Sequence, residues 1–336
     1  MSRIDLQYIG PLKRGLYQRS ENPLEEVWSW IARFGITEWL QRSAKMEKPW
    51  EDWGPYVVAR VRQAVEFRTA ARDISILTRP LPLYYSLLNL LRGFFAIAEA
   101  RKLKTGHGLR FVEEDQANFF DMRAKFIDGT FTDYLDAKNI PHEKGTVITL
   151  GQAFSRIIEI GDKISPSVGP YEVFQVSAEA WLSGKVRLHF HCPPGEAAHF
   201  PTNWQKWFPK LKDLCSLDPP GTVLIVDRPA AETIGREEIV DFFHQTLEVN
   251  LSSSIDDSSW FAIRQTDPKL DLPRAACYFI GAFILSSAVR YRPESLLAIS
   301  NPDSEAGWIV ARFLNAAECY FPHLLLNWVF KQDMYF

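Results

Sequence analysis

The chain has 336 residues, of which 46% are hydrophobic and 13% are aromatic, and this content excludes a disordered protein. Its formal net charge of -3 provides no overall attraction for DNA or anionic lipid, so any basic surface has to be local. The four cysteines are widely spaced and form no CxxC pair, which argues against a disulfide framework and against a thiolate zinc site.

No segment of the sequence favours secretion or a membrane. The opening segment, MSRIDLQYIGPLKRG, carries charges throughout and lacks the apolar centre of a signal peptide. The longest apolar run, 275–289, is bounded by Arg274 and Arg290 and is shorter than the roughly 20 residues that span a bilayer. We therefore expect a cytoplasmic protein without membrane contact, in which 275–289 is a core helix.

The first part of the chain is predicted to be helical. A helix should begin at Pro23, because Asn22 can cap its free amides and proline suits the first helical position. Apolar residues at helical intervals predict a second helix over 56–77, which the prolines that follow should end. A third helix over 83–104 is apolar on most of its circumference and should be central, and the glycines of 105–108 should close it.

The centre of the chain changes period. The segment 109–144 is rich in turn residues and has no clear assignment, and a helix is predicted over 149–164. Polar and apolar residues then alternate over 172–176 and 185–192, which predicts a β-hairpin. Further strands are predicted over 222–226 and 260–264, and amphipathic helices over 203–214 and 236–247.

The last part is predicted to be helical again, with Pro293 dividing a long apolar stretch and Pro322 kinking or restarting the final helix. The fold class is therefore α+β and mainly α, with helical N- and C-terminal parts around a smaller β-containing centre. We divide the chain into a helical region over 1–145, an α+β region over 146–268, and C-terminal helices over 269–336 that pack back on the first region.

Three segments together resemble the bacterial YaaC-like family. They are RPLPLYYSLLNLLRG (79–93) followed by GHGL (106–109), SSAVRYRPESL (286–296), and a terminal helix with FPHLLLN (321–327). Where the family usually has a tryptophan after RYRPE, this chain has Ser295 and Leu296. The resemblance implies a bacterial, cytosolic, mostly helical protein that acts beside other proteins in a defence or nucleic-acid-processing system, and it carries over no catalytic residues.

Arg101 and His107 match the R-x5-H spacing of HEPN-type ribonucleases. In such a site the arginine stabilises phosphate charge and the histidine moves a proton from the ribose hydroxyl. Tyr84, Tyr85 and Asn89 would then supply neighbouring polar contacts. The alternative is structural, because His107 lies between two glycines at a helix end and a histidine there can simply cap the turn.

Arg290 and Arg292 follow the apolar run and form a second candidate site. Two guanidinium groups at the end of a buried helix can hold a phosphate or carboxylate, because their planar fork matches both anions. The structural alternative is that arginines favour helix C-termini and that Arg290 pairs with Glu294.

Lys206 and Lys210 lie beside Trp204 and Trp207, and this alternation of basic and aromatic residues occurs in single-stranded nucleic-acid grooves. An ordinary amphipathic helix has the same pattern. His189 and His191 share one face of a predicted strand and are weak candidates for metal ligands, since no carboxylate lies at a matching spacing. We expect no metal and no other cofactor.

No P-loop, dinucleotide-binding, serine-hydrolase or zinc-protease motif is present in the sequence. The leading hypothesis is therefore an interaction protein that works through a protein partner and contacts nucleic acid, with a homo-oligomer as a further expectation. The alternative is a metal-independent, HEPN-like ribonuclease that uses Arg101 and His107.

Overall fold

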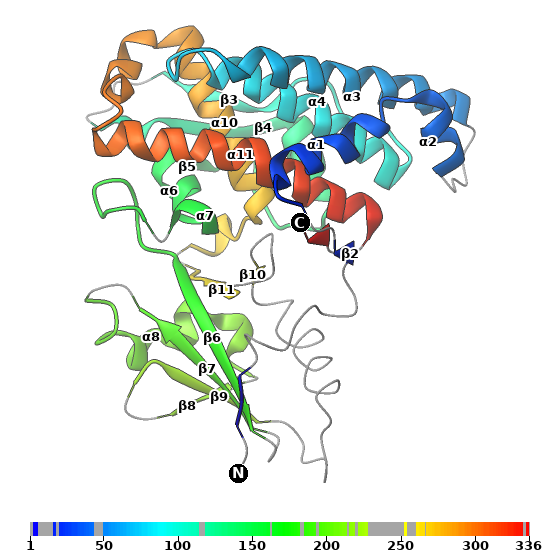
Figure 1. Cartoon of the computed structure of the whole chain (residues 1–336). Coiled ribbons are helices and arrows are strands. Elements are labelled where there is room, and N and C mark those ends of the chain that lie inside the picture. The colour runs from blue at the N-terminus through cyan, green and yellow to red at the C-terminus, as the bar shows by residue number, and fades with distance from the viewer. Residues whose placement is uncertain are drawn as a thin grey trace.

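The computed structural model describes most of the chain. The described residues are 3–5, 16–17, 20–43, 50–113, 118–161, 163–181, 185–192, 195–213, 215–218, 221–227, 252–253, 260–265, 267–331 and 334–335. Figure 1 shows a broad helical layer above a smaller, sheet-containing part, with the N-terminus next to the sheet. The mainly helical α+β class is confirmed.

The N-terminal helices are α1 (Pro23–Arg33), α2 (Thr37–Ser43), α3 (Trp50–Arg72) and α4 (Pro80–Glu99). The predicted start of α1 is confirmed, because the Asn22 side chain accepts a hydrogen bond from the backbone amide of Glu25. The predicted start of α4 at residue 83 was wrong by three residues. The helix begins at Pro80, because the missing amide hydrogen of a proline costs nothing in the first turn. The helix ends at Ala100, whose φ of 49° is left-handed, so 101–106 lies outside it.

The segment without an assignment, 109–144, contains most of β3 and all of β4, two strands of a small antiparallel sheet in the order β3-β4-β5. The elements of this region are β3 (His107–Val112), η2 (Phe119–Asp121), β4 (Arg123–Gly129), α5 (Thr130–Ala137) and β5 (Val147–Thr149). The single helix predicted over 149–164 is two short helices, α6 (Leu150–Ser155) and α7 (Ile158–Gly161).

The C-terminal elements are η5 (Pro268–Leu270), α10 (Arg274–Tyr291), η6 (Pro293–Ile299) and α11 (Glu305–Phe330). The predicted core helix is confirmed, because α10 is buried without interruption from Ala275 to Ala288. Pro322 lies inside α11, which is continuous through it. Both α10 and α11 pack against α4, so the central position predicted for that helix is confirmed.

The second sheet has seven strands, with β1 (Arg3–Asp5) on β6 and the others in the order β10-β11-β6-β7-β9-β8. The predicted hairpin is confirmed as β6 (Val173–Trp181) and β7 (Lys185–His191), which pair antiparallel. The other elements are β8 (Cys215–Asp218), β9 (Val223–Asp227), β10 (Ser252–Ser253), β11 (Trp260–Ile263), α8 (Phe200–Trp207) and η3 (Pro209–Leu211). The helix predicted over 236–247 lies outside the described residues. Two short strands, β2 (Leu16–Tyr17) and β12 (Met334–Tyr335), pair parallel elsewhere.

The described residues form two hydrophobic cores. The first contains the helices and the small sheet, and it continues along the chain to Val168 before resuming at Leu270. The second lies between the large sheet and α8, and runs from Phe174 to Ala262. The buried residues of 146–168 in these two cores therefore belong to the first core, with the helices, and not to the second, with the large sheet.

Within the described part of the chain, α4 is the helix long and apolar enough to cross a membrane, and 67% of its most apolar stretch is buried inside the protein. Such burial is typical of the central helix of a folded core.

Candidate anion-binding site

His107 is positioned by a close contact between the backbones at Gly108 and Gly129. Gly108 has a φ of +80°, and a Cβ atom there would lie 2.5 Å from the backbone nitrogen of Phe131. Gly129 approaches Gly108 equally closely from the other side. Only glycine permits this contact, which seats the start of β3 against the first turn of α5 and holds His107 in place.

The imidazole of His107 contacts two core helices. Its Nδ1 lies 2.7 Å from the hydroxyl oxygen of Tyr84 on α4, and its ring centroid lies 5.8 Å from that of Phe283 on α10. Burial lowers the pKa of His107, and the charges of Arg290 and Arg92 lower it further. Burial also raises the pKa of Tyr84. At neutral pH the pair is therefore an uncharged imidazole hydrogen-bonded to an uncharged phenol.

Arg92, on α4, is the first arginine near this pair, and Arg60 lies beside Arg92. Its guanidinium donates to Thr130 Oγ1 at 3.0 Å and to the carbonyl oxygen of Gly106 at 2.9 Å. Burial lowers the pKa of Arg92, and the charge of Arg60 lowers it further. Arg60, on α3, donates to Asn89 Oδ1 at 2.9 Å. Both guanidinium groups are therefore held by neutral oxygens.

The third arginine is Arg290, at the end of α10. It donates to the carbonyl oxygen of Ser286 and to the hydroxyl of Ser287, both at 3.3 Å, and its guanidinium lies 4.9 Å from the ring centroid of Tyr291. Its charge lowers the pKa of both His107 and Tyr84. The RYRP and GHGL motifs, which are about 180 residues apart, therefore meet at one site.

We call Arg60, Arg92, Arg290 and His107 the anion site. Among the residues that the structure describes, none of the three arginines forms an ion pair with a carboxylate. Half-buried guanidinium groups without a counter-ion attract an anion, and their forked donors match phosphate oxygens. A neutral histidine beside such an anion is also suited to proton transfer near pH 7.

Arg101 does not belong to this site. Because α4 ends at Ala100, Arg101 turns away, and its guanidinium forms an ion pair with Asp133 of α5 at 3.1 Å. It also lies 4.6 Å from the ring centroid of Phe95. The guanidinium charges that act on His107 are those of Arg92 and Arg290, whereas Arg101 is bound to Asp133.

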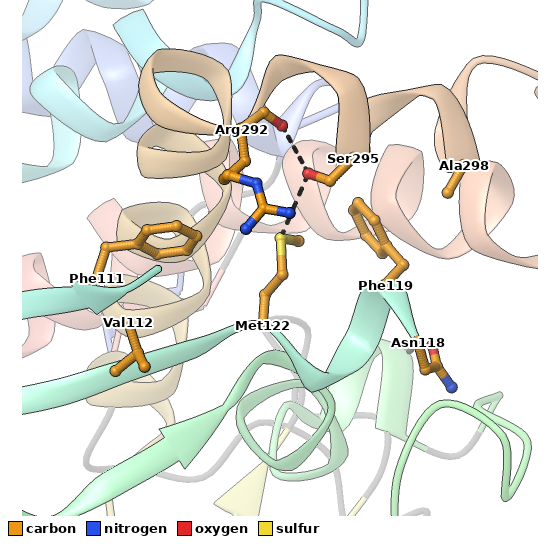
Figure 2. A pocket seen from close by; sticks show the side chains of 8 residues that line it. All are labelled: Phe111, Val112, Asn118, Phe119, Met122, Arg292, Ser295 and Ala298. Carbon is orange, nitrogen blue, oxygen red and sulfur yellow. Dashed lines mark hydrogen bonds between the residues drawn. The ribbon is translucent and has the colours of Figure 1, made fainter. Parts of the chain in front are cut away.

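Arg292 has other partners than Arg290. It forms an ion pair with Glu294 at 2.6 Å and donates to the carbonyl oxygen of Glu113 at 3.0 Å, so Arg292 makes the pair that the sequence suggested for Arg290. Its side chain lines a cavity between β3, η2 and η6, shown in Figure 2.

Lys206 and Lys210 lie in the other part of the molecule. Lys206 is exposed on α8, and Lys210 belongs to η3. The neighbouring rings of Trp204 and Trp207 are buried in the second core, at 5% and 6% exposure. They cannot stack on bases, so the alternation of basic and aromatic residues reflects an amphipathic helix here.

His189 and His191 lie on β7 as predicted, and His191 Nε2 lies 2.9 Å from Ser177 Oγ on the paired strand. Over the described ranges, no three histidine, cysteine or carboxylate side chains gather in a way that could hold a metal ion.

Sequence reasoning missed Arg60 and Arg92. The signal for Arg92 was present, because Tyr85, Asn89 and Arg92 follow a spacing of four and then three residues and share one face of an otherwise apolar helix. Arg60 joins this face only through the packing of α3 on α4, which a sequence does not reveal.

The fold and the site together define a mainly helical α+β protein with a cluster of arginines against its central helix. A family model described as YaaC-like Protein matches residues 39–329. The chain therefore belongs to the YaaC-like family, which confirms the resemblance seen in its motifs. Searches of curated proteins and of solved structures found no match for this chain.

Proposed function

We propose that this protein binds RNA through its phosphate backbone at the anion site, as a cytosolic component of a bacterial multi-protein system. The observation that carries the proposal is that the guanidinium charges of Arg92 and Arg290 act on His107, and that both groups have neutral partners only within the described part of the chain. RNA is favoured over DNA because a neutral histidine beside a phosphate can act on a ribose 2′-hydroxyl.

The test is a fluorescence anisotropy titration of a labelled single-stranded RNA of ten nucleotides. The double variant Arg92→Gln/Arg290→Gln should bind more than about tenfold more weakly, because each charged hydrogen bond contributes about 1.5–3 kcal/mol. Arg42→Gln/Lys331→Gln, at two exposed positions, controls for the loss of two positive charges. Equal affinity of the double variant and the unchanged protein would overturn the proposal.

The second candidate function is RNA cleavage without a metal. It is favoured by the lowered pKa of His107 and by the hydrogen bond of its Nδ1 to Tyr84. The imidazole would accept the 2′-hydroxyl proton as the 2′-oxygen forms a bond to phosphorus and the bond to the 5′-oxygen breaks, and the leaving 5′-oxygen would take a proton from water. The products would be a 2′,3′-cyclic phosphate and a 5′-hydroxyl, while Arg92 and Arg290 would stabilise the charge on the phosphoryl oxygens.

His107→Asn separates the two candidates, because it should abolish cleavage while leaving RNA binding within about threefold. Arg101→Gln tests the original pairing: the geometry predicts that cleavage persists, since Arg101 is bound to Asp133. Loss of cleavage in Arg101→Gln with folding intact would restore Arg101 to the catalytic role.

The protein partner is the other part of the proposal. It is supported by two large exposed apolar side chains, Leu297 on η6 and Trp308 on α11, at 67% and 42% exposure, and these elements pack against each other. The protein should co-purify with a defined partner, or with a second copy of itself, after nuclease treatment. The variant Leu297→Glu/Trp308→Glu should lose that partner while keeping its affinity for RNA.

A further inference from the structure

The cavity beside Arg292 has an aromatic and a charged wall. Its volume is about 150 Å³, and its lining includes Phe111, Phe119, Met122 and Arg292. Figure 2 shows the rings of Phe111 and Phe119 on either side of the Arg292 and Met122 side chains. Both rings are half-buried, and the Arg292 side chain keeps 28% exposure, so the cavity is open to a ligand.

This cavity and the anion site lie at opposite ends of β3, which packs against α10. At the start of β3, His107 contacts Phe283 of α10. Just after the end of β3, the carbonyl oxygen of Glu113 accepts from Arg292, which follows α10. The strand between spans ~17 Å. At ~3.4 Å per stacked nucleotide, this length corresponds to about five nucleotides. The charge of Arg290 acts at the start of the strand, where His107 lies.

We propose that this cavity holds one unpaired nucleobase of the RNA strand whose phosphate lies at the anion site. The inference rests on the proposed function and adds that the ligand is single-stranded. A base has flat faces that stack on phenylalanine rings and on the plane of a guanidinium such as that of Arg292. The cavity is smaller than the ~300–1,000 Å³ clefts that take drug-sized ligands, so its size suits a single ring system.

The test uses the full chain and ten-nucleotide RNAs in which one position at a time lacks its base. Removal of the base at one or two adjacent positions should weaken binding about tenfold, and removal elsewhere should have little effect. Phe111→Ala should weaken binding of the intact RNA by a similar factor and should remove the dependence on position. Trp308→Ala, a truncated aromatic on the exposed face of α11, is the matched control.

The outcomes separate the two proposals. If the unchanged protein binds RNA but every abasic position gives the same affinity, the cavity inference is overturned and the anion site remains. If the unchanged protein does not bind RNA, both are overturned. Should Phe111→Ala fail to fold by circular dichroism, the abasic series on the unchanged protein still decides. Arg292→Lys then gives a second readout, because lysine keeps the charge and loses the planar fork.

Discussion

Two arginine clusters share the helical core and differ in their partners. In the first, Arg68 and Arg79 donate to the carboxylate of Glu318, each at 2.8 Å, and Glu25 accepts from Arg68 as well. Glu318 is 4% exposed. In the second, the anion site, the arginines donate to amide, hydroxyl and carbonyl oxygens. Carboxylates therefore balance the guanidinium charges of the first cluster, whereas no described carboxylate balances those of the anion site.

The helices α3 and α4 contribute arginines to both clusters. Arg60 and Arg68 lie on α3, and Arg79 and Arg92 lie just before and within α4. Sequence position and helix type therefore do not separate a structural arginine from a ligand-binding one. What separates them is whether the fold brings a carboxylate to the guanidinium, and α11 does so only at Glu318 among its described contacts with these arginines.

The largest expected effect is on the first cluster. Glu318→Gln leaves the half-buried Arg79 without a carboxylate and the buried Arg68 with Glu25 alone, and should lower the free energy of unfolding by about 3–5 kcal/mol. Chemical denaturation measures this change. Glu66→Gln, at an exposed position of α3, is the matched control and should change stability by less than about 0.5 kcal/mol. A loss below about 1 kcal/mol in Glu318→Gln would remove the structural distinction between the clusters.

The next effect concerns pH and compares two histidines. Burial lowers the pKa of His323 to about 4, and it lowers the pKa of His107 of the anion site. The folded state therefore resists protonation, so stability is full above pH 6.5 and falls as the pH drops from 6.5 toward 4. His323 should account for about 3 kcal/mol of that loss.

Thermal and chemical unfolding between pH 7 and 4 check this expectation. His323→Asn keeps a donor for the carbonyl oxygen of Met334 and should flatten the pH dependence. An equally steep loss in the variant would assign the acid sensitivity to other groups, such as the carboxyls of Glu25 and Asp133, whose lowered pKa values act at lower pH.

A smaller effect should separate the two glycines around His107. Gly108→Ala forces a Cβ atom to within 2.5 Å of the Phe131 backbone at a φ of +80°, and should cost about 2 kcal/mol. Gly106→Ala has the same φ and no atom within 4 Å, so it should cost only about 1 kcal/mol. Differential scanning calorimetry measures the loss of stability in both variants, and the difference between them is the cost of the steric clash. Equal losses of stability would contradict the close approach of β3 to α5.

The smallest expected effect on stability is in the anion site. Arg92→Gln removes hydrogen bonds to Thr130 and Gly106 but deprives no carboxylate of its partner, so the free energy of unfolding should fall by only about 1 kcal/mol. The salt dependence of RNA affinity should change instead, with a slope lower by ~0.7 for each phosphate that the variant no longer neutralises. If Arg92→Gln destabilises the protein as strongly as Glu318→Gln, the two clusters are of one kind.

Local signals in the sequence predicted the elements that depend on local contacts. The cap at Asn22 and the alternation around β6 and β7 act within a few residues, and both predictions are confirmed. The sheet formed by β3, β4 and β5 was missed because its strands are short and β3 has an irregular register between His107 and Leu109. Such strands show little alternation, and their pairing comes from tertiary contacts.

The candidate site was predicted in part for the same reason. His107 and Arg290 were identified from their motifs, but their proximity depends on α10 packing beside α4 and β3. Arg101 looked equally suitable, and its pairing with Asp133 depends on α5, which was not predicted. A charged residue's partner comes from the fold, so a spacing such as R-x5-H predicts a site only when both residues lie on one regular element.

The central claim is that the anion site takes a phosphate-like anion and that the cluster around Glu318 does not. The most direct measurement is the anomalous diffraction of crystals soaked in tungstate, a tetrahedral oxyanion that is easily located. We expect an anomalous peak within hydrogen-bonding distance of the Arg92 and Arg290 guanidinium groups and no such peak at Arg68 or Arg79. A peak at the Glu318 cluster, or none at the anion site, would contradict the central claim.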